Sequence, residues 1–381
     1  MTVISDLTER LRESSAAHHL SRLLYFATLP LFALTSSSKS NIMRPTLISA
    51  LCVTLVVGCI ALGVSALHNH QKLLSLGIPT LDNPLQPNQI KSFVTFGDSY
   101  TDIVNVGDGP DAQAWPVYLS GYTKTTLYPF AKSGATCSNK LTYRPAPPVS
   151  ESQLPSYFNF HTTDAGKNVG GKDTVYTLWI GTNDLGANAL LTGNDPGVTV
   201  VDVAKCMVNW VKMLYDKGGA RNFIVQNMIP LQHVILYSAN SYYTWFWLKE
   251  RNSTAWSVQM TEMVEAGNAL TKLMLKDLAS TLPGAHIAYF DSHSLFQDIY
   301  DHPGLYLNGT VPYNVTGCIR PCVFKQNDPK SGVCSIVNGP ARDSYLWYDE
   351  LHPSEQANRI VAREIAQVFQ GKQSQWTTWL S

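Results

Sequence analysis

The sequence lacks an excess of charge of either sign. Its 381 residues include 28 Lys plus Arg and 28 Asp plus Glu, so the formal net charge is zero. Nucleic-acid-binding domains usually carry a basic excess, and the balance argues against that class. Charged residues are also scarce, at 15% against roughly 25% in typical soluble domains. Together with 18 Tyr, 9 Trp and 21 Pro, this scarcity favours a secreted protein over a cytosolic one.

Two motifs of hydrolytic enzymes are also missing. No Gly-x-Ser-x-Gly occurs, so the nucleophile elbow of the common lipases is absent. No His-Glu-x-x-His occurs, and no His lies near the cysteines at 318, 322 and 334, which argues against a zinc site. We therefore expect neither a metal nor another cofactor.

One long apolar run stands apart near the N-terminus. Residues 45–67 carry no charge, a length that can span a bilayer. If translation starts at Met43, the basic Arg44, the apolar stretch and the small residues 64–66 form a signal-peptide pattern with cleavage near Leu67. We expect residues 1–44 to be an extension that is disordered or not translated, and residues 68–89 to be a linker.

The same run has two other interpretations. If translation starts at Met1, Lys39 and Arg44 would hold its leading side in the cytosol and make it a type II anchor. It could also be a buried core helix. Both membrane interpretations place the rest of the chain outside the cytosol, either secreted or as a single-pass membrane protein. We therefore expect the membrane to be a partner only if the mature protein keeps the apolar run as an anchor.

Cysteines and glycosylation sequons agree with an oxidising compartment. Five cysteines follow the apolar run, at Cys137, Cys206, Cys318, Cys322 and Cys334. The last three share one loop, so we expect one disulfide within it and one thiol left free, with the full pairing not readable from the sequence. Three Asn-x-Ser/Thr sequons mark candidate glycosylation sites at Asn252, Asn308 and Asn314.

The order of apolar and amphipathic segments predicts the fold class. Short apolar runs at 92–96, 126–131, 174–180, 222–229 and 286–290 read as strands, and stretches at 198–217, 253–282 and 353–370 read as helices. Strands that are almost wholly apolar and alternate with helices are typical of a parallel sheet covered on both faces. We therefore expect one α/β catalytic domain over residues 90–381, with no internal repeat.

Polar residues follow three of these strands and precede the last helix. The segments are Gly97-Asp98-Ser99, Ser133-Gly134-Ala135, Gly181-Thr182-Asn183-Asp184 and Asp349-Glu350-Leu351-His352. In parallel sheets, reactive groups gather at the carboxyl ends of the strands. We therefore expect these four segments to meet in one site.

Together the four segments hold the parts of a serine hydrolase. Ser99 is the candidate nucleophile, His352 the general base and Asp349 the carboxylate that orients it. The Ser99 N–H, the Gly134 N–H and the Asn183 side chain are candidate oxyanion donors. Each segment alone is a common turn, cap or loop, and it is their conjunction that favours catalysis.

These blocks resemble the GDSL, or SGNH, hydrolase superfamily over residues 92 to about 370. The resemblance implies a three-layer α/β/α sandwich of flavodoxin-like type with a parallel five-stranded sheet. The segments 93–102, 115–118, 134–137 and 179–186 are similar to fungal carbohydrate esterase family 16, which implies an acetylesterase acting on acetylated sugars. The expected partner is an acetylated carbohydrate, and no nucleic acid.

Two alternatives remain open at this point. The same machinery suits a lipase or phospholipase, and a cell-surface protein could retain a relic of the site. Three tryptophans are candidates for contact with substrate: Trp115, Trp245 and Trp247. The aromatic segment 242–247 fits a sugar-stacking lip, a lipid-facing patch or core. The loop 303–342 looks like an insertion at the rim of the site.

Overall fold

The computed structural model describes residues 83–104 and 112–381. The helices are α4 (Trp115–Thr123), α5 (Leu154–His161), α6 (Thr182–Leu185), α7 (Val200–Gly218), α8 (Ser253–Ala279), α9 (Ser292–Asp301) and α10 (Glu355–Phe369). The strands are β1 (Ser92–Gly97), β2 (Thr126–Pro129), β3 (Gly171–Trp179), β4 (Ala220–Gln226), β5 (His286–Phe290), β6 (Asn314–Cys318), β7 (Cys322–Lys325), β8 (Asp328–Cys334), β9 (Tyr345–Trp347) and β10 (Thr377–Trp379).

The central sheet confirms the flavodoxin-like prediction and corrects its strand count. Its order in the described residues is β10-β5-β4-β3-β1-β2. β1 to β5 are parallel, in the order 2-1-3-4-5 that characterises flavodoxin-like folds. The sheet has six strands rather than five, because β10 adds to β5 in the antiparallel direction. The chain order reverses between β1 and β3, and that switch point is where such sheets bind ligands.

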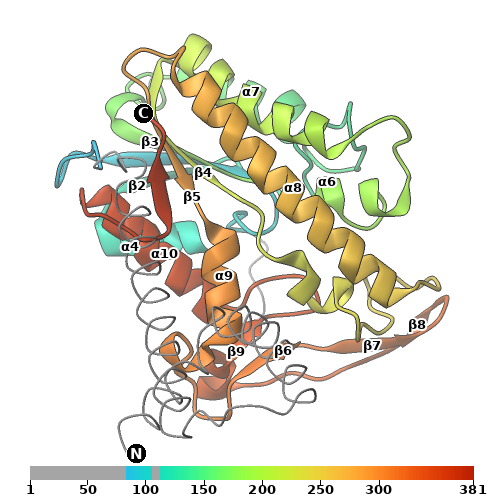
Figure 1. Ribbon diagram of the computed structural model, residues 1–381. Coiled ribbons are helices and arrows are strands. Elements are labelled where there is room, and N and C mark those ends of the chain that lie inside the picture. The colour runs from blue at the N-terminus through green and yellow to red at the C-terminus, as the bar shows by residue number, and fades with distance from the viewer. Residues whose placement is uncertain (1–82, 105–111) are drawn as a thin grey trace, which may run out of the picture. The chain divides into compact units, whose positions relative to one another are not determined.

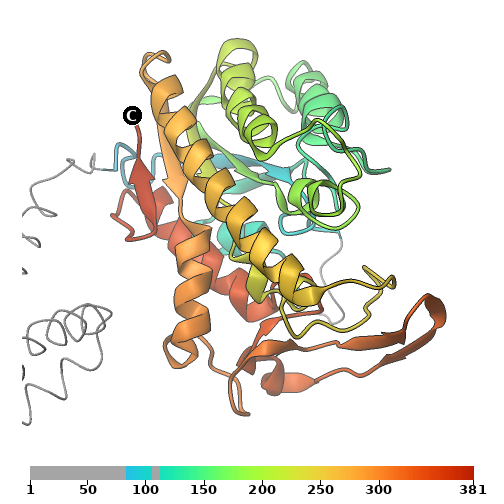
Figure 2. The ribbon, with the colours of Figure 1, turned by 45° about the vertical axis from the view of Figure 1, so that its right-hand side comes forward.

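Helices cover both faces of the sheet, as expected for a three-layer sandwich (Figure 1). Phe93 and Phe96 of β1 lie on opposite faces, because side chains alternate along a strand. The ring of Phe93 packs on Phe369 of α10, whereas Phe96 packs on Tyr157 of α5 and Trp210 of α7. α4 packs with α10, and α7 packs with α8. Turned by 45°, the molecule shows α8 running along the outside of this second layer (Figure 2).

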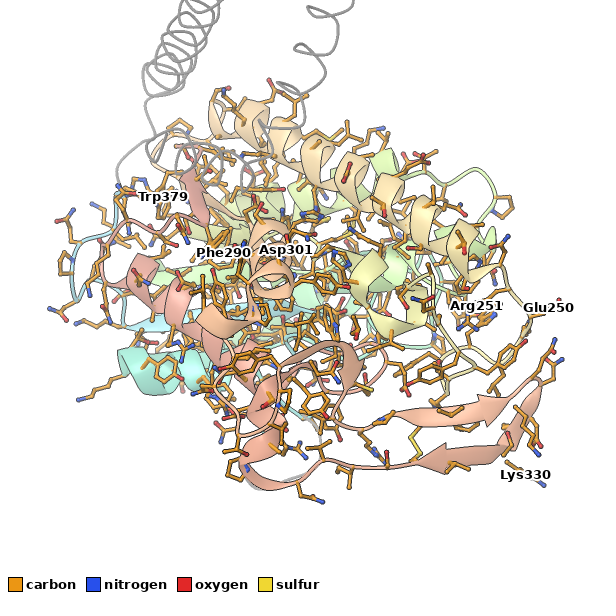
Figure 3. The ribbon with its side chains drawn as sticks, turned by 60° about the horizontal axis from the view of Figure 1, so that its bottom comes forward. Glu250, Arg251, Phe290, Asp301, Lys330 and Trp379 are labelled. Atoms are coloured by element: carbon orange, nitrogen blue, oxygen red, sulfur yellow. A yellow bond between two sulfur atoms is a disulfide. The ribbon has the colours of Figure 1, made fainter. Side chains whose placement is uncertain are left out.

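Residues 303–342, predicted as one loop, contain the strands β6, β7 and β8, which contribute to two small sheets. β6 pairs with β9, and β7 and β8 form an antiparallel hairpin that extends from the domain (Figure 3). The Cys322–Cys334 disulfide joins the two strands of this hairpin, and Cys318 is a buried free thiol. Both features confirm the prediction for this loop. A second disulfide, Cys137–Cys206, could not be paired from the sequence.

The domain begins before residue 90. Of the predicted linker 68–89, residues 83–89 are described, and they pack on the domain. Leu85 is fully buried, and the Asn83 side chain donates hydrogen bonds to the carbonyls of Val368 and Lys372. The predicted extension 1–44 and the apolar run 45–67 lie outside the described residues. Among the helices that are described, none is both long and apolar enough to span a membrane.

Candidate active site

The turn after β1 is built so that Ser99 stands at the edge of the sheet. Gly97 has φ +147°, and a Cβ there would lie 2.2 Å from the Trp179 carbonyl oxygen, so only glycine fits. The buried Gln153 side chain accepts from the Gly97 N–H at 3.0 Å and donates to the Gly97 carbonyl at 2.8 Å. Its amide thus holds the Gly97 backbone much as a neighbouring strand would.

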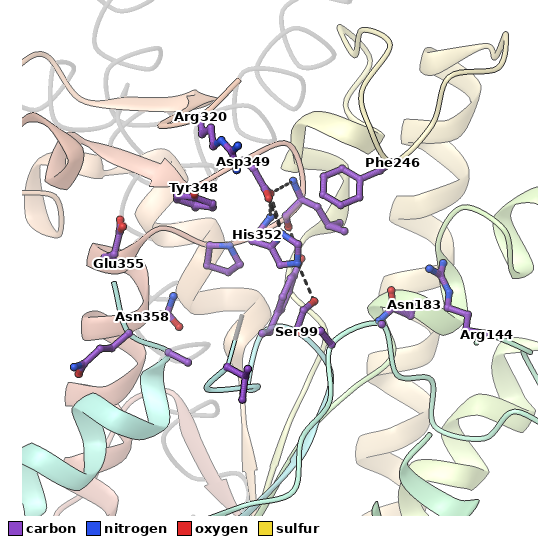
Figure 4. A pocket seen from close by; sticks show the side chains of 18 residues that line it. Ser99, Arg144, Asn183, Phe246, Arg320, Tyr348, Asp349, His352, Glu355 and Asn358 are labelled. Carbon is purple, nitrogen blue, oxygen red and sulfur yellow. Dashed lines mark hydrogen bonds and ion pairs between the residues drawn. The ribbon is translucent and has the colours of Figure 1, made fainter. Parts of the chain in front are cut away.

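His352 and Asp349 lie together in one turn before α10. Asp349 Oδ1 accepts hydrogen bonds from the backbone N–H groups of Leu351 and His352, both at 2.8 Å. Its two carboxylate oxygens also lie 2.9 and 3.0 Å from His352 Nδ1. The far ring nitrogen, Nε2, lies 2.9 Å from Ser99 Oγ. The three side chains therefore form one continuous hydrogen-bonded chain (Figure 4).

The electrostatics of the pair suit a base that takes up a proton. Burial would lower the pKa of His352, but the adjacent Asp349 carboxylate outweighs it and raises that pKa above its usual value. Burial would likewise raise the pKa of Asp349, but the imidazole and the two backbone N–H groups hold it below its usual range. Asp349 therefore stays ionised and stabilises the imidazolium form of His352.

Candidate backbone and side-chain donors from three strand ends, at Ser99, Gly134 and Asn183, line the same cavity. Among the described residues, the N–H groups of Ser99 and Gly134 donate to no protein acceptor. Gly134 has φ +78°, a left-handed conformation that favours glycine. Asn183 Nδ2 donates one N–H to the Ala135 carbonyl at 2.9 Å, which fixes the amide and leaves its second N–H unused. These are the donors that an oxyanion hole requires.

Two buried aspartates hold the Gly134 loop in place. Asp102 Oδ2 accepts from the Ser133 N–H at 2.8 Å and from the Ser133 hydroxyl at 2.9 Å. Asp184 accepts from the Cys137 N–H at 3.0 Å and from the Thr142 hydroxyl at 2.8 Å. The Cys137–Cys206 disulfide ties the same loop to α7. The loop is therefore fixed at both ends by interactions with other elements.

Asp98, directly before Ser99, is a buried carboxyl group. It is 1% exposed, its Oδ1 accepts from the Tyr100 N–H at 2.9 Å, and its Oδ2 has no hydrogen-bond partner in the part of the chain that the structure describes. Burial raises the pKa of Asp98 to about 7, against the lowering effects of the Tyr100 N–H and of His352. Asp98 is therefore protonated in mildly acidic conditions.

Ser99 opens into a cavity of about 530 Å³. Polar residues line much of its wall, and Figure 4 labels Arg144, Arg320, Glu355 and Asn358 among them. The Phe246 ring, 5.8 Å from the His352 ring, supplies an apolar patch beside His352. Because Arg320 lies in the segment 303–342, the predicted insertion does reach the rim of the site.

The three candidate tryptophans have different surroundings. Trp115 is fully buried and donates from Nε1 to the Thr101 hydroxyl, so it has no surface on which a sugar could stack, and that prediction is wrong. Trp247 is half-buried, packs on Trp256 and does not line the cavity. Trp245 is 66% exposed and lies next to Phe324 of the hairpin. The one aromatic side chain of this segment that reaches the cavity is Phe246.

The sequon asparagines lie at the surface. Asn252 and Asn308 are exposed, and Asn314 is half-buried. Asn252 also serves as the N-cap of α8, where its Oδ1 accepts from the Ala255 N–H at 3.0 Å. Asn252 and Asn308 are therefore accessible to solvent, as a glycan acceptor must be.

Comparison with known proteins identifies a family and several relatives. The family described as GDSL-like Lipase/Acylhydrolase matches residues 93–365 of this chain. An acetylesterase of Hypocrea jecorina is 32% identical over 338 residues, covering 78% of this chain and 93% of that protein. An acetylesterase of Thermothelomyces thermophilus is 25% identical over 327 residues, covering 78% and 95%. A GDSL esterase/lipase of Arabidopsis thaliana is 26% identical over 211 residues, covering 52% and 53%. The resemblance found in the sequence is thus confirmed.

Proposed function

Because the chain belongs to the GDSL-like lipase/acylhydrolase family, and is therefore a carboxylic ester hydrolase, we propose that it removes acetyl groups from acetylated sugars with Ser99 as nucleophile. The observation that carries the proposal is the chain from Ser99 Oγ to His352 Nε2 at 2.9 Å and from His352 Nδ1 to Asp349 at 2.9 Å. This is the geometry by which a hydroxyl loses its proton as it attacks.

The first half-reaction forms an acetyl-enzyme. Ser99 Oγ attacks the ester carbonyl carbon while His352 Nε2 takes the hydroxyl proton. The carbonyl oxygen becomes an oxyanion, which accepts hydrogen bonds from the N–H groups of Ser99 and Gly134 and from Asn183 Nδ2. When the intermediate collapses, the bond to the sugar oxygen breaks, and His352 gives its proton to that oxygen. The sugar leaves with a free hydroxyl.

The second half-reaction releases acetate. A water molecule loses a proton to His352 and attacks the acetyl carbonyl, and the same donors hold the oxyanion. The bond to Ser99 Oγ then breaks, and His352 returns the proton to the serine. Asp349 keeps the imidazole oriented through both halves and stabilises its charged form without taking the proton itself.

The choice of an acetylated sugar rests on the cavity and on the relatives. Two of the relatives are acetylesterases and align along 93% or more of their length. The cavity of about 530 Å³ carries Gln113, Glu355 and Asn358 on its wall, groups that suit the hydroxyls of a sugar better than an acyl chain. Trp245, exposed beside Phe246, is the remaining candidate for stacking on a sugar ring outside the cavity.

We further propose that the enzyme acts outside the cell and carries glycans. Two disulfides within the described residues and sequon asparagines at the surface support an oxidising secretory route. Cleavage near Leu67 would release the domain, whereas retention of residues 45–67 would anchor it. N-terminal sequencing of the natural protein distinguishes the two outcomes.

Acetate release from acetylated xylo-oligosaccharides by the purified enzyme tests the proposed function. The parent should release acetate, and Ser99→Ala should lower kcat by about 10³-fold or more while its melting temperature stays close to that of the parent. A series of 4-nitrophenyl esters with acyl chains of two to twelve carbons is the companion assay. Faster hydrolysis of the long chains would replace the acetylesterase with a lipase, and failure to react with a fluorophosphonate would indicate a relic site.

A further inference from the structure

Arg144 is a half-buried guanidinium in the wall of the active-site cavity. Figure 4 shows it beyond Asn183, on the side of the cavity away from Glu355 and Asn358. Its Nη2 donates to the Ala187 carbonyl, and its Nε is buried without a partner. No described carboxylate forms an ion pair with Arg144, and its remaining N–H groups have no partner among the described residues. The cavity wall thus holds a cation whose hydrogen-bonding capacity is largely unused.

The carboxylates that line the same cavity are already engaged. Asp349 is hydrogen-bonded to His352, and Glu355 forms an ion pair with Arg342. Burial raises the pKa of Asp98 and of Asp184, and the charge of Arg144 only opposes that rise, because neither carboxyl group lies within ion-pair distance of Arg144. Asp98 and Asp184 take no N–H group of Arg144. The N–H groups of Nη1 and Nη2 that do not donate to the Ala187 carbonyl are therefore left for a ligand, whereas Nε is buried.

We propose that Arg144 binds a carboxylate on the substrate, so that the preferred substrate is an acetylated glycan bearing an acidic sugar. A guanidinium presents paired N–H groups that match the two oxygens of a carboxylate, and a partly desolvated pair of this kind is stronger than one in open water. The inference rests on the proposed function for one step. In the proposed reaction the acyl group of the ester is acetyl, which carries no carboxylate. The carboxylate must therefore belong to the alcohol part of the ester, as in a uronic acid near the acetylated sugar.

Two small esters isolate the effect of the carboxylate. One probe is 4-acetoxybenzoate, which carries a carboxylate on its alcohol half, and the other is its neutral methyl ester. The quantity compared is the ratio of kcat/KM for the anionic probe to that for the neutral one, so a general loss of activity cancels. The variants are Arg144→Gln, which removes the charge, and Arg144→Lys, which keeps it.

The control is a guanidinium in a similar setting outside the site. Arg221, also half-buried, donates to the Ala220 carbonyl at 2.7 Å and lies at the start of β4, whereas Ser99 follows the carboxyl end of β1, a strand of the same parallel set. Arg221→Gln removes the same charge from the protein without touching the cavity. It should leave the ratio unchanged.

We expect Arg144→Gln to lower the ratio about tenfold or more, in line with the loss of a hydrogen bond to a charged group. Arg144→Lys should lower it less. Added salt should reduce kcat/KM for the anionic probe in the parent and have little effect in Arg144→Gln. An equal loss on both probes, or a ratio that does not depend on Arg144, would show that the residue only supports the loop and would overturn the proposal.

The proposed function and this inference fail in different ways. If the parent hydrolyses both probes but releases no acetate from acetylated oligosaccharides, the proposed sugar substrate is wrong, whatever Arg144 does. If the parent deacetylates neutral xylo-oligosaccharides and uronic acid-bearing ones equally well, the proposed function stands and the role of Arg144 is refuted.

Discussion

Asp98→Asn should flatten the pH dependence of stability. The carboxyl group of Asp98 is 1% exposed, and burial raises its pKa from the usual 3.8 to about 7. The folded protein therefore holds this proton more tightly than the unfolded chain. Below about pH 4 both states bind the proton and its contribution to stability is fully present. As the pH rises to 7, the unfolded chain releases the proton before the folded protein does. The free energy of unfolding therefore falls by about 4 kcal/mol.

Urea unfolding followed by tryptophan fluorescence from pH 4 to pH 8 measures this contribution. Other groups, Asp184 among them, titrate in both proteins, so the difference in unfolding free energy between parent and Asp98→Asn isolates Asp98. That difference should shift by about 4 kcal/mol in favour of the variant between pH 4 and pH 8. Asn keeps the oxygen that accepts from the Tyr100 N–H, so the turn itself should survive. A difference that stays constant within about 1 kcal/mol would refute the reasoning.

Three further predictions concern the catalytic groups and the loop that holds them. Asp349→Asn removes the charge that raises the pKa of His352, so the acid limb of the kcat/KM profile should move to lower pH while kcat falls; an unmoved limb would point to another base. Asn183→Ala should lower kcat by about 10²–10³-fold in steady-state kinetics, and a change in KM alone would make Asn183 a substrate-binding residue. Replacing Cys137 and Cys206 by Ser should lower the unfolding free energy by about 2–4 kcal/mol in urea titrations, and an unchanged midpoint would contradict the stabilising role given to that disulfide.

The sequence predicted the elements whose signals are local. β5 was predicted at residues 286–290 and lies there, and α7 begins at Val200 within two residues of its expected start. Its capping box between Thr199 and Asp202, and Gly219 in the left-handed conformation after its end, explain why these boundaries were visible. β10 was missed because three residues give no periodicity, and it becomes a strand only by pairing with β5.

The same distinction applies to the site. The four blocks that meet around Ser99 could be predicted, because the carboxyl ends of parallel strands all lie at the same end of the sheet. The burial of Trp115 could not be predicted, since it depends on how α4 packs against α10. The hydrogen bonds that Asp102 accepts from Ser133, and that Gln153 accepts from the Gly97 N–H, join segments 31 and 56 residues apart. No local pattern in the sequence marks such contacts.

The hydrogen bonds made by Asp102, Asp184 and Gln153 affect how the enzyme loses activity when it unfolds. Each joins a loop at the catalytic edge to another segment, so the loops are ordered by the same cooperative transition that folds the domain. The described loops at this end of the sheet therefore need no ordering step of their own when substrate arrives, and we expect them to lose order together with the domain when the protein is heated or denatured. We therefore expect enzyme activity to be lost at the same denaturant concentration at which the domain unfolds, and not at a lower one.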